Sequence, residues 1–168
     1  MPLPAWDVFI GLAFLIGNAY GFIIRREKTI TVLCSTYIGL VIATNFSSYL
    51  FEFFNGNKMI ANQLWIRSNA SLSTISIVTL LFSTYLVSGA INSTNQKPGD
   101  ISPFEVFIYS SLNIALLVAS VIGFLPEASR EAALATSKIA PIIYNYRTTW
   151  VILPPLALVI LNFRRKDK

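Results

Sequence analysis

The sequence predicts an all-α fold, a polytopic membrane helical bundle of four or five transmembrane helices with short interfacial helices. Three observations support it. The 168 residues are 54% hydrophobic and 12% charged, whereas a soluble domain carries about a quarter charged residues. The apolar residues fall in runs long enough to cross a bilayer as helices, and basic residues gather at the ends of these runs. The length leaves room for a single transmembrane domain, residues 1–168.

The first two spans are predicted at about 7–24 and 29–54. Asp7 is suited to cap the first turn, and Trp6 before it suits the membrane interface. Only a short charged stretch separates the two spans, so we expect them to form an antiparallel helical hairpin. That stretch consists of Arg25, Arg26, Glu27 and Lys28.

The third and fourth spans are predicted at about 71–91 and 103–125. The third is rich in serine and threonine, and the polar stretch 92–100 that follows it contains Pro98 and Gly99, as a solvent loop does. The fourth begins with a capping-box pattern, in which a serine cap precedes a proline and a glutamate in the first turn. These residues are Ser102, Pro103 and Glu105.

Three further segments are amphipathic or short. Residues 55–70 mix apolar and polar side chains and are expected to form an interfacial helix. Residues 127–141 are rich in alanine and predict a surface helix. The apolar stretch 148–163 has only 16 residues and contains Pro154 and Pro155. It either crosses as a kinked fifth span or dips into the membrane as a hairpin, and we favour the crossing.

The distribution of basic residues predicts the orientation. Five spans with the N-terminus outside place eight of the 13 Lys and Arg residues inside, and four spans with the N-terminus inside place nine there. The totals do not discriminate, but the first span has no basic residue before it and three directly after it. Since the first helix usually sets the orientation, we predict a multi-pass membrane protein with the N-terminus outside and the C-terminus cytoplasmic.

Small residues recur at every fourth position in three spans, which places them on one face of each helix. In lipid, helices associate by close backbone approach and interhelical hydrogen bonds, and small side chains permit that approach. We therefore predict helix packing along these rows, either within the chain or between two copies. The rows are Ala13, Gly17 and Gly21; Ser35, Gly39, Ala43 and Ser47; and Ser111, Ala115, Ala119 and Gly123.

Polar residues inside the spans have two interpretations. Asn18, Asn45 and Asn113 are expected to bridge helices, which is the commoner role of such residues. Alternatively, some of the polar side chains line a path for an ion or proton, because acids inside a membrane often mark such paths. The residues of this candidate polar path are Asn45, Glu52, Ser76, Thr79 and Ser83.

The residue types that most enzymes need are missing. The chain has no histidine and one cysteine, Cys34, and it has no phosphate-binding loop and no pair of acids spaced as a catalytic dyad. We therefore predict no catalytic residue, no metal or cofactor site and no enzymatic activity. The net charge of +5 lies beside apolar segments, so the expected partners are the lipid bilayer and a protein or second copy, and no nucleic acid.

The first 50 residues carry a recognisable pattern: Trp6-Asp7 before an apolar span, then Gly17-x-x-x-Gly21-Phe22, Arg25-Arg26 and a long second span. This resembles the CvpA (colicin V production protein) family, and the similarity in hydropathy extends over about residues 5–125. The resemblance implies a bacterial inner-membrane protein linked to envelope homeostasis or to export of a peptide toxin. It supplies no catalytic residues. Glu27 and Lys28 stand where members often carry a glycine after the basic residues.

Together these observations predict a non-enzymatic membrane protein that acts by helix packing with partners or with itself. Two alternatives stay open. One is a transporter or channel component that uses the candidate polar path, and the other is an accessory subunit of a larger membrane complex.

Overall fold

The computed structural model describes residues 6–54, 70–91 and 103–166, and all regular structure in these ranges is α-helical. The all-α prediction is therefore confirmed. The helices are α1 (Trp6–Phe54), α2 (Leu72–Ala90), α3 (Pro103–Phe124), α4 (Glu127–Thr136), α5 (Ala140–Asn145) and α6 (Arg147–Lys166).

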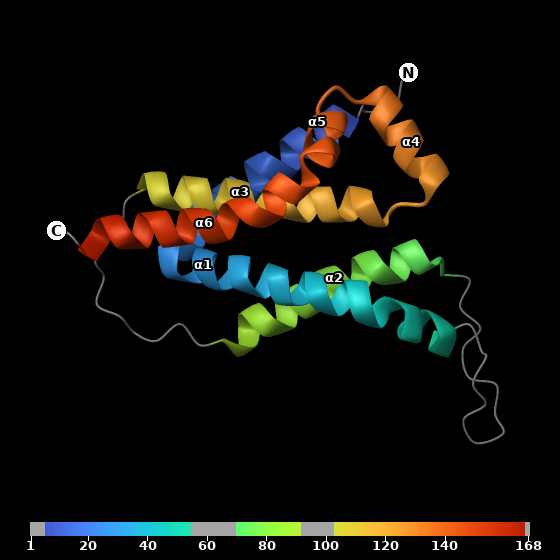
Figure 1. Ribbon diagram of the computed structural model, residues 1–168, viewed down its shortest axis with the longest axis horizontal. Coiled ribbons are helices and arrows are strands. Elements are labelled where there is room, and N and C mark those ends of the chain that lie inside the picture. Colours follow the sequence, from blue (N-terminus) through green and yellow to red (C-terminus); the bar gives the residue numbers. More distant parts are fainter. Residues whose placement is uncertain (1–5, 55–69, 92–102, 167–168) are drawn as a thin grey trace.

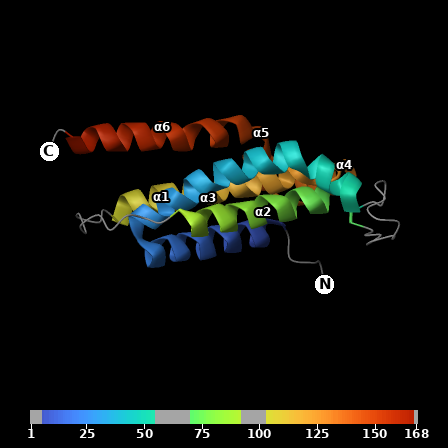
Figure 2. The same ribbon diagram turned by 90° about the horizontal axis from the view of Figure 1, so that it is seen from below.

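Helix α1 is one hydrogen-bonded helix of 49 residues, yet its axis turns back sharply near residues 25–28 (Figure 1, Figure 2). The Thr29 hydroxyl donates to the Gly21 carbonyl at 3.4 Å. Residues eight apart in a straight helix are about 12 Å apart along the axis, so this bond requires the bend. We call Trp6–Ile24 the first arm of α1 and Lys28–Phe54 the second arm. The predicted loop between two spans is thus a helical bend, which fits its lack of glycine and proline.

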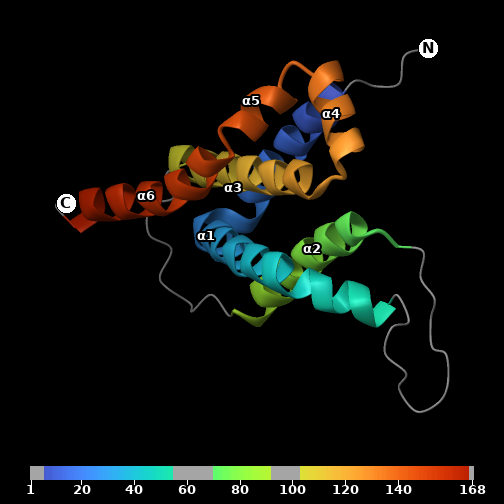
Figure 3. The ribbon, with the colours of Figure 1, turned by 45° about the vertical axis from the view of Figure 1, so that its right-hand side comes forward.

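Five long segments run in alternating directions (Figure 1, Figure 3). The second arm of α1 packs against α2, the first arm packs against α3, and α6 lies along α3. The central hydrophobic cluster joins α1, α3 and α5 through Ile10, Ile114, Ile122, Ala140 and Ile143. Helix α1 begins at one end of the bundle, and α6 ends at the opposite end (Figure 1).

Four segments are long and apolar enough to cross a membrane: the two arms of α1, α2 and α3. Large apolar side chains cover their outer surfaces. Examples that are 60–77% exposed are Leu15, Ile23, Val41, Phe82 and Tyr85. Such a surface is costly in water and favourable in lipid. The chain therefore has the architecture of a membrane helical bundle.

The predicted surface helix at 127–141 is two helices instead of one. Helix α4 ends at Thr136, and α5 begins at Ala140. Pro141 explains the break, because a continuous helix would lose the bond from residue 141 to the Ser137 carbonyl and would clash there. The Ser137 hydroxyl oxygen instead accepts from the Ala140 N–H at 2.8 Å and thereby satisfies the first N–H of α5.

Helix α6 continues through Pro154 and Pro155, and it forms no hairpin. Pro155 has no N–H for the Val151 carbonyl, which lies four residues before it. The Tyr37 hydroxyl, from the second arm of α1, donates to this carbonyl at 2.5 Å. A neighbouring helix thus supplies the missing hydrogen bond, as membrane helices with internal proline require. Helix α6 contains a shorter apolar segment, Arg147–Ile160.

Three predictions fall outside the described residues. They are the interfacial helix at 55–70, apart from Ala70, the solvent loop at 92–100 and the capping role of Ser102. The predicted start of the fourth span is found, because α3 begins at Pro103 with Glu105 in its first turn.

Candidate functional site

Gly39 lies at the contact between α1 and α2, where the two backbones come close. A Cβ atom on Gly39 would overlap the Thr84 hydroxyl and would lie 3.0 Å from the Leu80 carbonyl oxygen and 3.1 Å from the Thr84 nitrogen. The last two atoms belong to the backbone of α2 and cannot rotate away. Only glycine allows this separation between the helices.

Gly17 and Gly21 lie at the contact between the first arm of α1 and α3. A Cβ on Gly17 would overlap Cδ1 and Cγ1 of Ile114. A Cβ on Gly21 would overlap the Ser110 hydroxyl and lie 2.9 Å from Ser110 Cβ. The neighbours here are side chains of α3, so the backbones are farther apart than at Gly39.

The other small residues of the three rows lie in or beside these contacts, with one exception. Gly123 has no atom within 4 Å of an added Cβ, and it therefore makes no close helix contact, contrary to the prediction for its row. It borders a cavity instead. The buried members of the rows are Ser35, Ala43, Ser47, Ala115 and Ala119, and the partly buried members are Ala13 and Ser111.

One asparagine links two helices. The Ser111 hydroxyl of α3 donates to Asn18 Oδ1 of α1 at 3.1 Å, and Asn18 Nδ2 donates to the Phe14 carbonyl at 2.9 Å. Asn113 is buried, and its Oδ1 has no partner among the described residues. Asn45 is exposed and donates within its own helix, to the Val41 carbonyl at 2.8 Å.

The structure does not bring the five residues of the candidate polar path together. Ser83 is buried, and its hydroxyl is placed to donate to the Gly39 carbonyl at 3.5 Å and to the Thr79 carbonyl in the preceding turn. Ser76 is also buried on α2 and donates to the Leu72 carbonyl. Asn45 and Glu52 are exposed. The groove between α1 and α2 includes Thr79 and Ser83, but most of its walls are aliphatic and aromatic.

Asn45, Ser48 and Glu52 form what we call the outer polar face of α1. All three side chains are exposed, and their spacing of three and four residues places them on one stripe of the helix. The buried residues of this arm, Ala43 and Ser47, lie on another face, toward α2. The outer polar face is therefore not used by the packing among residues 6–54, 70–91 and 103–166.

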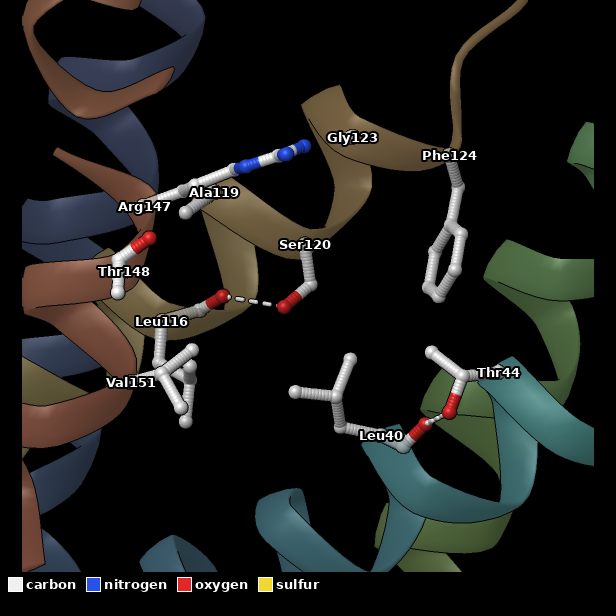
Figure 4. Close-up of a pocket in the computed structure, with 10 residues that line it drawn as sticks. All are labelled: Leu40, Thr44, Leu116, Ala119, Ser120, Gly123, Phe124, Arg147, Thr148 and Val151. Atoms are coloured by element: carbon white, nitrogen blue, oxygen red, sulfur yellow. Dashed lines mark hydrogen bonds between the residues drawn. The ribbon is translucent and has the colours of Figure 1, made fainter. Parts of the chain in front are cut away.

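A cavity of about 320 Å³ lies between the second arm of α1, α3 and α6 (Figure 4). Its walls are mainly apolar, and Arg147 is its one charged lining residue. Figure 4 shows the Arg147 side chain extended across the α3 side of the opening, with its guanidinium end toward Gly123. The lining residues are Leu40, Thr44, Leu116, Ala119, Ser120, Gly123, Phe124, Arg147, Thr148 and Val151.

Two polar contacts between distant segments were not foreseen from the sequence. The Asp7 carboxylate accepts hydrogen bonds from the Ser137 hydroxyl and from the N–H groups of Lys138 and Ile139. It therefore ties the first turn of α1 to the start of α5. The Lys28 ammonium donates to the Ser88 carbonyl at 2.7 Å, which supplies a donor for the last turn of α2.

Comparisons of this chain with models of protein families, with curated proteins and with solved structures give no match. The functional interpretation therefore depends on the geometry and on the residue chemistry.

Proposed function

We propose that this is a non-enzymatic, multi-pass inner-membrane protein that acts by helix packing with a partner, and that the outer polar face of α1 is the contact. The observation that carries the proposal is the exposure of Asn45, Ser48 and Glu52 within one apolar span. Polar side chains inside a membrane are rare on surfaces that face lipid and usually meet another polypeptide or water.

The partner expected at this face is a membrane helix that carries hydrogen-bonding side chains, in a second copy or in another protein. Asn45 offers an amide, Ser48 a hydroxyl and Glu52 a carboxyl group, so a helix with amide or hydroxyl groups at matching spacing is complementary. Bonds of this kind between membrane helices contribute about 0.6 to 2 kcal/mol each. Three along one stripe are sufficient to define a register.

The predicted orientation in the membrane fits the proposed location in the inner membrane. With α6 as a fifth crossing, the bend of α1 and the end of α6 face one side, which carries eight of the 13 Lys and Arg residues. This side is cytoplasmic under the positive-inside rule, and the N-terminus is outside. The resemblance to the CvpA family favours a role in envelope homeostasis or toxin export.

Cysteine cross-linking in native membranes tests the contact. In a Cys34→Ser background, Ser48→Cys is compared with Val78→Cys, because Val78 is 57% exposed on the apolar outer surface of α2. We expect a discrete adduct from Ser48→Cys, of twice the monomer mass for a second copy, and its loss on Asn45→Leu. Equal yields of cross-linked adduct from Ser48→Cys and Val78→Cys would refute the proposal. An adduct of Ser48→Cys whose yield does not change on Asn45→Leu would also refute it.

The transporter alternative has less support, because Ser83 is buried against the second arm of α1 and Ser76 is buried on α2, while Glu52 is exposed. A proton flux in liposomes that Glu52→Gln abolishes would favour it over our proposal. An accessory subunit of a larger complex would use the same contact. A cross-linked adduct with a larger complex would identify this role.

A further inference from the structure

The cavity beside α6 combines a cation at its opening with apolar walls below. Arg147 is the first residue of α6, and it lies beside Gly123, at the end of the apolar helix α3. The cavity extends along α3 from Gly123 to Leu116. Seven residues of helix cover about 10 Å, so the cavity reaches well below the level of Arg147.

The charge of Arg147 is not neutralised by the described part of the chain. Its guanidinium carbon lies 5.4 Å from the centre of the Tyr144 ring. Arg130 stacks on the same ring at 5.6 Å and also pairs with Glu127 at 3.9 Å. No carboxylate of the described residues pairs with Arg147. The ring contact orients the guanidinium group but leaves its N–H donors available to an anion.

Two of the hydroxyl groups in the walls already have hydrogen-bond acceptors. The hydroxyls of Thr44 and Ser120 donate to the Leu40 and Leu116 carbonyls, four residues before each. The interior therefore presents mainly hydrocarbon, and an apolar group fits it better than water. Its volume of about 320 Å³ lies at the lower end of the usual range for ligand pockets.

We propose that this cavity binds an acyl chain of an anionic phospholipid whose phosphate group contacts Arg147. Arginine recognises phosphate through paired, charge-assisted hydrogen bonds. An anionic phospholipid has the required order of groups, with phosphate at the edge of the apolar layer and hydrocarbon beneath it. The inference needs the protein to lie in a membrane, but it does not depend on a partner at the outer polar face of α1.

Binding of phosphatidylglycerol and phosphatidylcholine to the purified full chain, measured by native mass spectrometry in detergent, tests this site. Both lipids carry the phosphate, but the choline cation of phosphatidylcholine pairs with that phosphate and repels Arg147, whereas the glycerol headgroup does neither. We therefore expect phosphatidylglycerol to bind about tenfold more tightly. Arg147→Gln should abolish this preference, whereas Lys138→Gln, which removes an exposed cation outside the lining residues, should keep it.

A second experiment fills the cavity with a larger side chain. Gly123→Leu and Gly11→Leu are matched variants, because an added Cβ meets no atom within 4 Å at either position, and only Gly123 lines the cavity. We expect Gly123→Leu to weaken binding of both lipids about tenfold or more and Gly11→Leu to leave it unchanged. This second experiment tests the lipid site even where Arg147→Gln lowers the yield of folded protein.

Three results would overturn the proposal. They are equal affinity of the unmodified protein for the two lipids, unchanged binding by folded Gly123→Leu, and displacement of the lipid by soluble glycerol phosphate at equal concentration. The last would assign the site to a free phosphate compound without an acyl chain. None of these results bears on cross-linking at Ser48, so this inference and the proposed partner contact can fail separately.

Discussion

The two contacts that α1 makes with its neighbours use the same residue type at different separations. At the α1–α2 contact, Gly39 faces the backbone of α2, whereas at the α1–α3 contact Gly17 and Gly21 face side chains of α3. In both contacts a buried hydroxyl stands directly opposite a glycine: Thr84 opposite Gly39 and Ser110 opposite Gly21. Neither hydroxyl oxygen has a conventional hydrogen-bond partner among the described residues.

The difference between the two contacts shows at which of them a small residue is required. The hydrogen of glycine that occupies the place of Cβ points at the opposing hydroxyl oxygen, an arrangement that permits a weak Cα–H···O bond. Where the neighbour is a side chain, a rotamer change can accommodate a larger residue. Where the neighbour is backbone, the whole helix must move, so we expect the α1–α2 contact to tolerate substitution least.

The largest effect is expected from Gly39→Leu. The added side chain would meet the Leu80 carbonyl and the Thr84 nitrogen and force α2 away from α1. We expect a loss of about 3 kcal/mol or more in the free energy of unfolding, at the upper end of overpacking costs. Thermal unfolding in detergent measures it, with Leu12→Ile as the control, because Leu12 is 51% exposed.

Gly21→Ala and Gly17→Ala sharpen the comparison within the α1–α3 contact. At Gly21 the added methyl group meets Ser110 Cβ, which is fixed to the backbone, so we expect a cost of about 1 to 3 kcal/mol. At Gly17 it meets Cδ1 and Cγ1 of Ile114, which a rotamer change can move away, and we expect about 1 kcal/mol or less. An equal loss of unfolding free energy in the two variants would show that the identity of the opposing atom is unimportant.

The contact of α6 depends on a hydrogen bond instead of a glycine. Tyr37→Phe removes the donor to the Val151 carbonyl, and we expect it to cost about 1 to 3 kcal/mol, because an acceptor loses its partner. Pro155→Ala restores an N–H to that carbonyl, so Tyr37→Phe should cost much less in a Pro155→Ala background. A double-mutant cycle on unfolding free energies measures this coupling. Additive effects would contradict the role assigned to Tyr37.

The smallest effect is expected from Ser111→Ala. It removes the bond to Asn18 at the α1–α3 contact without adding volume. Hydrogen bonds between membrane helices contribute about 0.6 kcal/mol on average, so the unfolding free energy should fall by about that amount. A loss as large as that of Gly21→Ala would mean that polar bridging, and not close approach, dominates this contact.

The sequence contains enough information for the helices and for the small residues at their contacts. Hydropathy located four long apolar segments, and four-residue spacing placed Gly17, Gly21 and Gly39 on defined faces. The sequence also contains a signal for the break between α4 and α5, because Pro141 excludes a continuous helix through Ser137.

The tertiary features of the candidate site had no local signal. Pro155 predicts that the Val151 carbonyl loses its donor, but the replacement, Tyr37, is 114 residues away in sequence. Gly123 has the spacing of its row and yet borders a cavity, because four-residue spacing defines a face and does not specify what lies opposite. The position of Arg147 at that cavity likewise depends on how α6 packs against α3.

The claim that α1 and α2 need a glycine at their closest point is tested most directly by Gly39→Ala and Gly11→Ala in the same lipid bilayer. The measured quantity is the free energy of unfolding of each variant relative to the unmodified chain. We predict a loss of about 1 to 3 kcal/mol for Gly39→Ala and no loss for Gly11→Ala, whose added methyl group meets no atom within 4 Å. Equal values for the two variants would contradict the account.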